Sequence, residues 1–137
     1  MKRNNPIRQL KDEANPFAVF CVVHRSGLVA ATTRAADRGE GDRIGLPGGK
    51  VDTGESPVEA AIREAKEEGW KVGGRATLVA SRMVEGRPVL WFEFETAEPL
   101  KVFKESHRGI RPIWVTVDEI ANSGYGNDFL KTFFKKN

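Results

Sequence analysis

The chain has 137 residues, 39% of them hydrophobic and 30% charged, which is typical of a soluble globular protein with one core. We therefore expect one domain over residues 1–137, with residues 1–16 as a loose N-terminal arm or an added strand. A formal charge of +3 is too small to indicate a nucleic-acid partner. There is no apolar run of about 18 residues and no export signal, so we expect neither a membrane span nor secretion.

The first predicted elements are two apolar, β-rich runs, residues 17–23 and 28–33, which residues 24–27 join into a hairpin. The lone cysteine, Cys21, lies in the first run and predicts a buried thiol in a reducing compartment, so we expect a cytoplasmic protein. Residues 34–43 are polar and predict a loop. Arg34, at its start, offers a fork of donors for a phosphate, although a solvated loop arginine would give the same signal.

Residues 46–49, Leu-Pro-Gly-Gly, and residues 52–54, Asp-Thr-Gly, predict two glycine-bearing turns at which backbone can approach a ligand. A helix follows. Ser56 and Glu59 form a capping box around Pro57 at the first helical position, and Gly69 ends the helix. The apolar stripe predicted to face the core consists of Val58, Ala61, Ile62 and Ala65.

Three carboxylates, Glu64, Glu67 and Glu68, project from one side of this helix, next to the apolar stripe. Like charges at this spacing repel one another, so a cation is expected to offset the repulsion. Carboxylate oxygens suit Mg²⁺ or Mn²⁺. The alternative is a solvated acidic face that forms salt bridges with Arg63 and Lys66.

The rest of the chain predicts strands at 70–72 and 76–84, a turn at 85–88 and a strand at 89–95. Leu90, Phe92 and Phe94 are expected in the core, whereas Trp91 on the opposite face either stacks on a base or packs. A charged loop at 101–111, a strand at 112–117, a short helix from 118 and an amphipathic helix end the chain. The apolar side of this last helix holds Phe129, Leu130, Phe133 and Phe134, and its polar side Lys131, Lys135 and Lys136. This order predicts an α/β protein with a mixed sheet and helices on both faces.

Residues 49–71 resemble the Nudix box, G-x5-E-x7-R-E-U-x-E-E-x-G-U, where U is a bulky apolar residue. The residues in register are Gly49, Glu55, Arg63, Glu64, Glu67 and Glu68. The end of the motif departs from the pattern, because Gly69 comes one residue early and Trp70 occupies the glycine position. Ala65 is also small for its apolar position. Every acidic position is retained.

The resemblance implies the Nudix fold, a three-layer α/β/α sandwich, and hydrolysis of a substrate built on a nucleoside diphosphate. It implies that Glu64, Glu67 and Glu68, with the Gly48 carbonyl, hold Mg²⁺ or Mn²⁺. Glu64 or Glu105, from the 101–111 loop, would orient or deprotonate the attacking water. Arg63 would orient a carboxylate. The expected substrate-binding residues are Arg34, Gly49 and Trp91.

The short chain favours a compact nucleotide: a nucleoside triphosphate, normal or oxidised, cleaved to monophosphate and pyrophosphate. ADP-ribose or a dinucleoside polyphosphate is the alternative within the enzyme class. A module that binds a nucleotide or an RNA 5′ end with little turnover is the alternative outside it. The expected partner is this small nucleotide, and the protein is expected to be a monomer or a homodimer.

Overall fold

The computed structural model describes residues 18–34, 43–122 and 127–135. The predicted N-terminal arm and residues 35–42 of the predicted loop lie outside these ranges, as do Lys136 and the side chains of Phe134 and Lys135. One four-stranded sheet has the order β5(Gly48–Lys50), β1(Ala18–Val22), β7(Arg87–Pro99), β6(Trp70–Val84). It is mixed, because β1 pairs parallel with β7 while the other two pairings are antiparallel.

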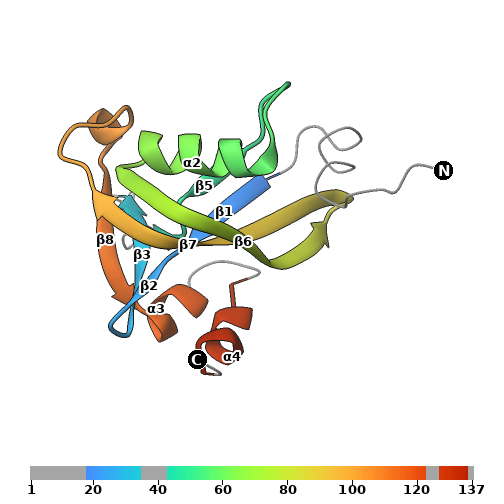
Figure 1. Cartoon of the computed structure of the whole chain (residues 1–137). Helices are drawn as coiled ribbons and strands as arrows, with labels where there is room; N and C mark the ends of the chain where they lie inside the picture. The colour runs from blue at the N-terminus through green and yellow to red at the C-terminus, as the bar shows by residue number, and fades with distance from the viewer. Residues whose placement is uncertain (1–17, 35–42, 123–126, 136–137) are drawn as a thin grey trace.

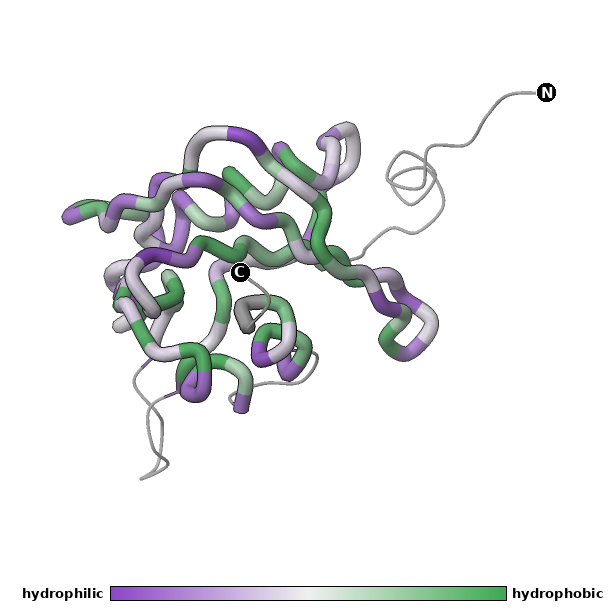
Figure 2. Tube along the Cα trace, turned by 60° about the horizontal axis from the view of Figure 1, so that its bottom comes forward, coloured by the Kyte–Doolittle hydropathy of each residue, from purple (hydrophilic) through white to green (hydrophobic). Residues whose placement is uncertain are grey.

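A second sheet contains β2(His24–Arg25), β3(Leu28–Arg34) and β4(Arg43–Gly45), and β8(Ile110–Thr116) pairs with the other side of β3. Figure 1 shows α2(Pro57–Glu67) on one side of the strands and α3(Val117–Ala121) and α4(Phe129–Lys135) on the other. Figure 2 shows hydrophobic stretches along the strands in the middle of the molecule. The predicted α/β/α sandwich with a mixed sheet is confirmed.

Helix α2 begins as predicted. The Ser56 hydroxyl accepts from the Glu59 backbone N–H at 3.1 Å, and the Glu59 carboxylate accepts from the Ser56 N–H at 2.8 Å. The prediction that Ile62 faces the core is wrong, since its side chain is 42% exposed. Ala60 is buried instead, because the small residues of α2 allow the helix to lie close to the sheet.

Both predicted hairpins need correction at their turns. His24 lies in β2 rather than in a turn, and the turn to β3 is Ser26-Gly27, with φ of 52° and 82°. Pro88 lies in β7, and the turn from β6 is Glu85-Gly86, with φ of 52° and 79°. Two consecutive positive φ values belong to the two-residue turn whose twist matches that of paired strands. The first long run, β1, pairs with β5 and β7 and not with β3.

The first part of strand β7, from Pro88 to Phe92, is buried on both faces. Leu90, Phe92 and Phe94 lie in the core beneath α2, as predicted. Trp91 lies in the second core cluster, 2% exposed, where its indole N–H donates to Asn127 Oδ1 at 3.2 Å. The expectation that Trp91 binds substrate is therefore wrong in this structure, because the ring is enclosed by core residues; the packing alternative describes it.

The chain continues from β7 through a short helical turn, η1(Ser106–Arg108), into β8 and then α3. Two backbone hydrogen bonds attach the segment before η1 to the end of α2, Leu100 N–H to Gly69 O at 2.8 Å and Glu105 N–H to Glu67 O at 3.0 Å. This segment therefore lies against the acidic end of the helix. None of the helices in the described ranges has the length and apolarity needed to cross a membrane.

Candidate active site

Strand β5 packs unusually close to both of its neighbours. A side chain at Gly48 would collide with the Val19 carbonyl and Phe20 of β1, and one at Gly49 would collide with the Glu64 carboxylate of α2. The predicted turn at these glycines is therefore a strand, and its glycines are needed for close approach. Gly49, predicted to bind substrate, makes room for Glu64.

Arg63 joins the acidic residues of α2 to the loop before it. Its guanidinium donates to Glu55 at 2.6 and 3.1 Å, to Glu64 at 3.1 Å and to Glu67 at 3.2 Å. It also donates to the Lys50 carbonyl at 3.0 Å. The hydrogen bonds from Arg63 lower the pKa of Glu55, and the same carboxylates raise the pKa of Arg63. Arg63 thus fixes the orientation of several carboxylates at once.

Glu68 is the most enclosed acid of the group. Its Oε1 accepts from the Gly48 N–H at 3.1 Å. Burial raises its pKa to about 8, the charges of Glu64 and Glu105 add to the rise, and the Gly48 N–H and Arg34 oppose it. Burial, with Glu67 and Glu105, also raises the pKa of Glu64 against the effect of Arg63. Glu64 and Glu68 are therefore partly buried carboxylates that repel each other and the neighbouring acids.

Glu105 reaches this group from the segment between β7 and η1. Its side chain is 15% exposed, and its charge acts on both Glu64 and Glu68. The neighbouring Lys104 lies 3.6 Å from Glu67 Oε2, a contact that the sequence did not reveal. The structure therefore brings the predicted loop glutamate to the predicted acids, while its role stays a prediction.

The carboxylates of this group suit a divalent cation that keeps part of its water shell better than one whose ligands all come from the protein. Within the described ranges, no three His, Cys, Asp or Glu side chains are grouped closely enough to hold a metal by themselves. Arg63 engages Glu64 and Glu67, and Gly48 engages Glu68. Mg²⁺ keeps several waters and takes its other ligands from one or two carboxylates and the substrate phosphates. A site of this kind needs no complete set of protein ligands, and the charge of the cation would offset the repulsion between the carboxylates. The predicted ligand role of the Gly48 carbonyl stays a prediction.

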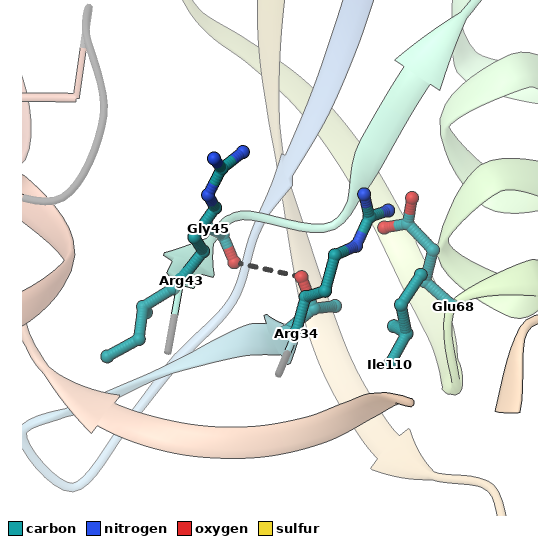
Figure 3. Close-up of a pocket in the computed structure, with 7 residues that line it drawn as sticks. Arg34, Arg43, Gly45, Glu68 and Ile110 are labelled. Carbon is teal, nitrogen blue, oxygen red and sulfur yellow. Dashed lines mark hydrogen bonds between the residues drawn. The ribbon is translucent and has the colours of Figure 1, made fainter. Parts of the chain in front are cut away.

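A pocket of about 180 Å³ adjoins Glu68 (Figure 3). It is lined by Thr32, Arg34, Arg43, Ile44, Gly45, Glu68 and Ile110. In Figure 3 the Arg34 guanidinium lies beside the Glu68 carboxylate. Arg34 was predicted from the sequence, whereas Arg43 was treated only as the end of a polar loop. The pairing of β3 with β4 places Arg43 directly opposite Arg34.

A family model and two known proteins that resemble this chain all indicate the same family. The model of the NUDIX domain matches residues 14–136. A nucleoside triphosphate pyrophosphatase/Nudix hydrolase fusion protein of Bifidobacterium longum is 35% identical over 96 residues, 65% of this chain and 19% of the relative. An 8-oxo-dGTP diphosphatase of Escherichia coli is 37% identical over 52 residues, 38% of this chain and 40% of the relative. The chain thus matches less than half the length of either protein.

Solved structures agree in fold. A structure of MutT, from work on Aliivibrio salmonicida and Vibrio cholerae, has a TM-score of 0.66 at 21% identity, covering 89% of this chain and 98% of that one. An ADP compounds hydrolase has a TM-score of 0.68 at 18% identity, covering 89% of this chain and 74% of that one. With the family model matched over most of the chain and Glu64, Glu67 and Glu68 of the motif gathered at the end of α2, the chain belongs to the Nudix hydrolase family.

Proposed function

We propose that this protein is a metal-dependent pyrophosphohydrolase that cleaves a nucleoside triphosphate, normal or oxidised, to the monophosphate and pyrophosphate. The observation that carries the proposal is the position of Glu68, which lines a pocket that also holds Arg34 and Arg43 and feels the charges of Glu64 and Glu105. Acids that repel one another suit divalent cations, and guanidinium groups suit phosphates. The two together suit a phosphoanhydride.

A bound divalent ion would neutralise phosphate charge and lower the pKa of the attacking water. Glu64, Glu67 and Glu68, with the Gly48 carbonyl, are the proposed ligands. The water oxygen forms the new bond to phosphorus, the phosphoanhydride P–O bond breaks, and Glu105 or Glu64 accepts the proton. Arg63 keeps Glu64 and Glu67 oriented through its hydrogen bonds. Arg34, which lines the pocket, binds phosphate oxygens.

ADP-ribose is the second candidate, and a structural similarity to an ADP compounds hydrolase favours it. That similarity, at 18% identity, concerns the fold, whereas the pocket with its two arginines favours a substrate with more phosphate groups.

The buried thiol of Cys21, 1% exposed, suits a reducing compartment, and we propose a cytoplasmic enzyme.

The test is product analysis by ion-exchange chromatography. Nucleoside triphosphates, oxidised triphosphates, ADP-ribose, dinucleoside polyphosphates and capped RNA are each incubated with Mg²⁺ or Mn²⁺. The blank is the Glu67→Gln, Glu68→Gln double variant. Metal-dependent release of monophosphate and pyrophosphate from triphosphates, absent from the blank, is the expected result. Preferred cleavage of ADP-ribose would replace the substrate assignment, and equal rates in the blank would refute the site.

A further inference from the structure

The pocket beside Glu68 is built on one face of the second sheet. Arg43 of β4, Arg34 of β3 and Ile110 of β8 lie opposite one another in register, and Thr32 is opposite Gly45. Residues paired in register, and those two positions along a strand, project from the same face of a sheet. The side chains of Arg34 and Arg43 therefore leave neighbouring strands on the same side.

The charges of the pocket follow a definite order. Glu68 lies on the α2 side, Arg34 beside it, and Arg43 one strand farther away (Figure 3). Neighbouring strands lie about 4.8 Å apart, so the step from Arg34 to Arg43 leads away from the acidic group by about one strand width. A ligand whose reacting phosphorus lies at the acids meets Arg34 first and Arg43 second.

The floor of the pocket is open at Gly45, two positions along β4 from Arg43. Gly45 lines the pocket, and a Cβ added there would meet no atom within 4 Å. The other residues that line the pocket are a threonine and two isoleucines, so the lining formed by the described residues contains no aromatic ring on which a base would stack. The chemistry of this pocket suits phosphate oxygens more than a nucleobase.

We propose that Arg43 is a specificity-determining residue that binds the phosphate group farthest from the nucleoside, so that the pocket receives the pyrophosphate end of a triphosphate. This inference rests on the proposed function and adds the orientation of the substrate. ADP-ribose, whose outer group is a neutral sugar, would present no anion to Arg43. The second arginine therefore selects triphosphates over diphosphate-linked sugars.

The first test is steady-state kinetics of Arg43→Gln with a triphosphate and with ADP-ribose. The KM for the triphosphate is expected to rise about tenfold or more, because a charge-assisted hydrogen bond is lost, with kcat within about twofold. The KM for ADP-ribose is expected to stay unchanged. Arg82→Gln is the matched control, because Arg82 is an exposed arginine of β6, at the sheet edge opposite β5.

The second test does not depend on turnover. Isothermal titration calorimetry measures the binding of inorganic tripolyphosphate and of a nucleoside monophosphate, with a chelator present. Arg43→Gln is expected to weaken tripolyphosphate binding about tenfold and to leave the monophosphate unaffected. Gly45→Val, which places a side chain in the open floor, is expected to weaken tripolyphosphate binding without lowering the melting temperature.

The outcomes separate the two proposals. If the wild type cleaves triphosphates and Arg43→Gln keeps the same preference for triphosphate over ADP-ribose, the inference is wrong and the proposed function stands. If the wild type cleaves none of the substrates, the proposed function fails. Calorimetry then decides the inference alone: a tripolyphosphate affinity equal in wild type, Arg43→Gln and Gly45→Val would overturn it.

Discussion

Glu68 is a carboxylate for which the folded protein favours the protonated form. Burial raises its pKa from 4.5 to about 8, and the charges of Glu64 and Glu105 act in the same direction. As pH rises from about 5 to about 8, the unfolded chain releases this proton while the folded chain keeps it. The folded state then binds more protons than the unfolded state, so the free energy of unfolding falls with rising pH.

We predict that the metal-free protein loses about 2 kcal/mol of stability between pH 5 and pH 8, less than one fully buried carboxyl would cost. The raised pKa of Glu64 adds to this loss. The lowered pKa of Glu55 acts below this window, since its contribution is lost on acidification through its folded pKa. Urea denaturation with a chelator present, at steps of half a pH unit, measures the slope.

Glu68→Gln keeps an oxygen acceptor for the Gly48 N–H and removes the titration, so the slope between pH 5 and pH 8 is expected to flatten. Glu98→Gln is the matched control, because Glu98 is an exposed carboxylate of β7. An unchanged slope in Glu68→Gln would show that another group titrates in this range.

At the scale of the element, α2 is a helix whose beginning also organises the site. Ser56 caps it, and the preceding Glu55 receives two hydrogen bonds from Arg63. Fraying of the first turn would therefore loosen the residue that holds the Arg63 guanidinium. Helix α3 has the same capping box, formed by Thr116 and Glu119, outside the candidate site.

We predict that Ser56→Ala and Thr116→Ala each lower stability by about 1 kcal/mol, the usual cost of an N-cap. Because only the first cap lies next to the Glu55 and Arg63 pair, Ser56→Ala is expected to lower kcat/KM about threefold and Thr116→Ala to leave it unchanged. Thermal denaturation and steady-state kinetics check both. An equal loss of activity in the two variants would mean that activity follows overall stability.

The local signals of α2 explain why it was predictable from the sequence. Ser56, Pro57, Glu59 and Gly69 act within a few residues, so the cap and the end of the helix were correct. Ile62 was misplaced because apolar spacing gives a stripe without saying where the sheet lies. The close approach of β5 to α2, which Gly49 allows, is likewise not encoded by the spacing of the apolar residues.

In the molecule as a whole, the failures come from strand pairings and contacts that local sequence patterns do not specify. The pocket with two arginines exists because β3 pairs with both β4 and β8, so Arg43 could not be linked to Arg34 from spacing alone. Trp91 was left open between base stacking and packing, because its burial depends on α4, nearly forty residues later in the chain. The parallel pairing of β1 with β7 likewise joins a strand that precedes α2 in the sequence to one that follows it.

Helix α4 and the residue before it are attached to the sheet through Trp91 of β7. The Trp91 indole N–H donates to Asn127 Oδ1, and the ring lies against Phe129 with centroids 5.5 Å apart. Asn127, 7% exposed, lies just before α4, so this hydrogen bond joins the last described segment to the central strand β7. Removing its acceptor leaves a buried N–H unpaired, which costs about 1–3 kcal/mol.

A double-mutant cycle measures this attachment. Asn127→Ala and Trp91→Phe are each expected to destabilise the protein, and the double variant to lose about 1 kcal/mol less than the sum, because Asn127→Ala has no indole N–H to leave unpaired once Trp91 is replaced. The control is Trp70→Phe with Asn127→Ala. Trp70 donates to the Ala31 carbonyl in the region under α2, so these two changes are expected to add. Additivity in the Trp91 cycle would mean that apolar packing alone holds α4 on the sheet.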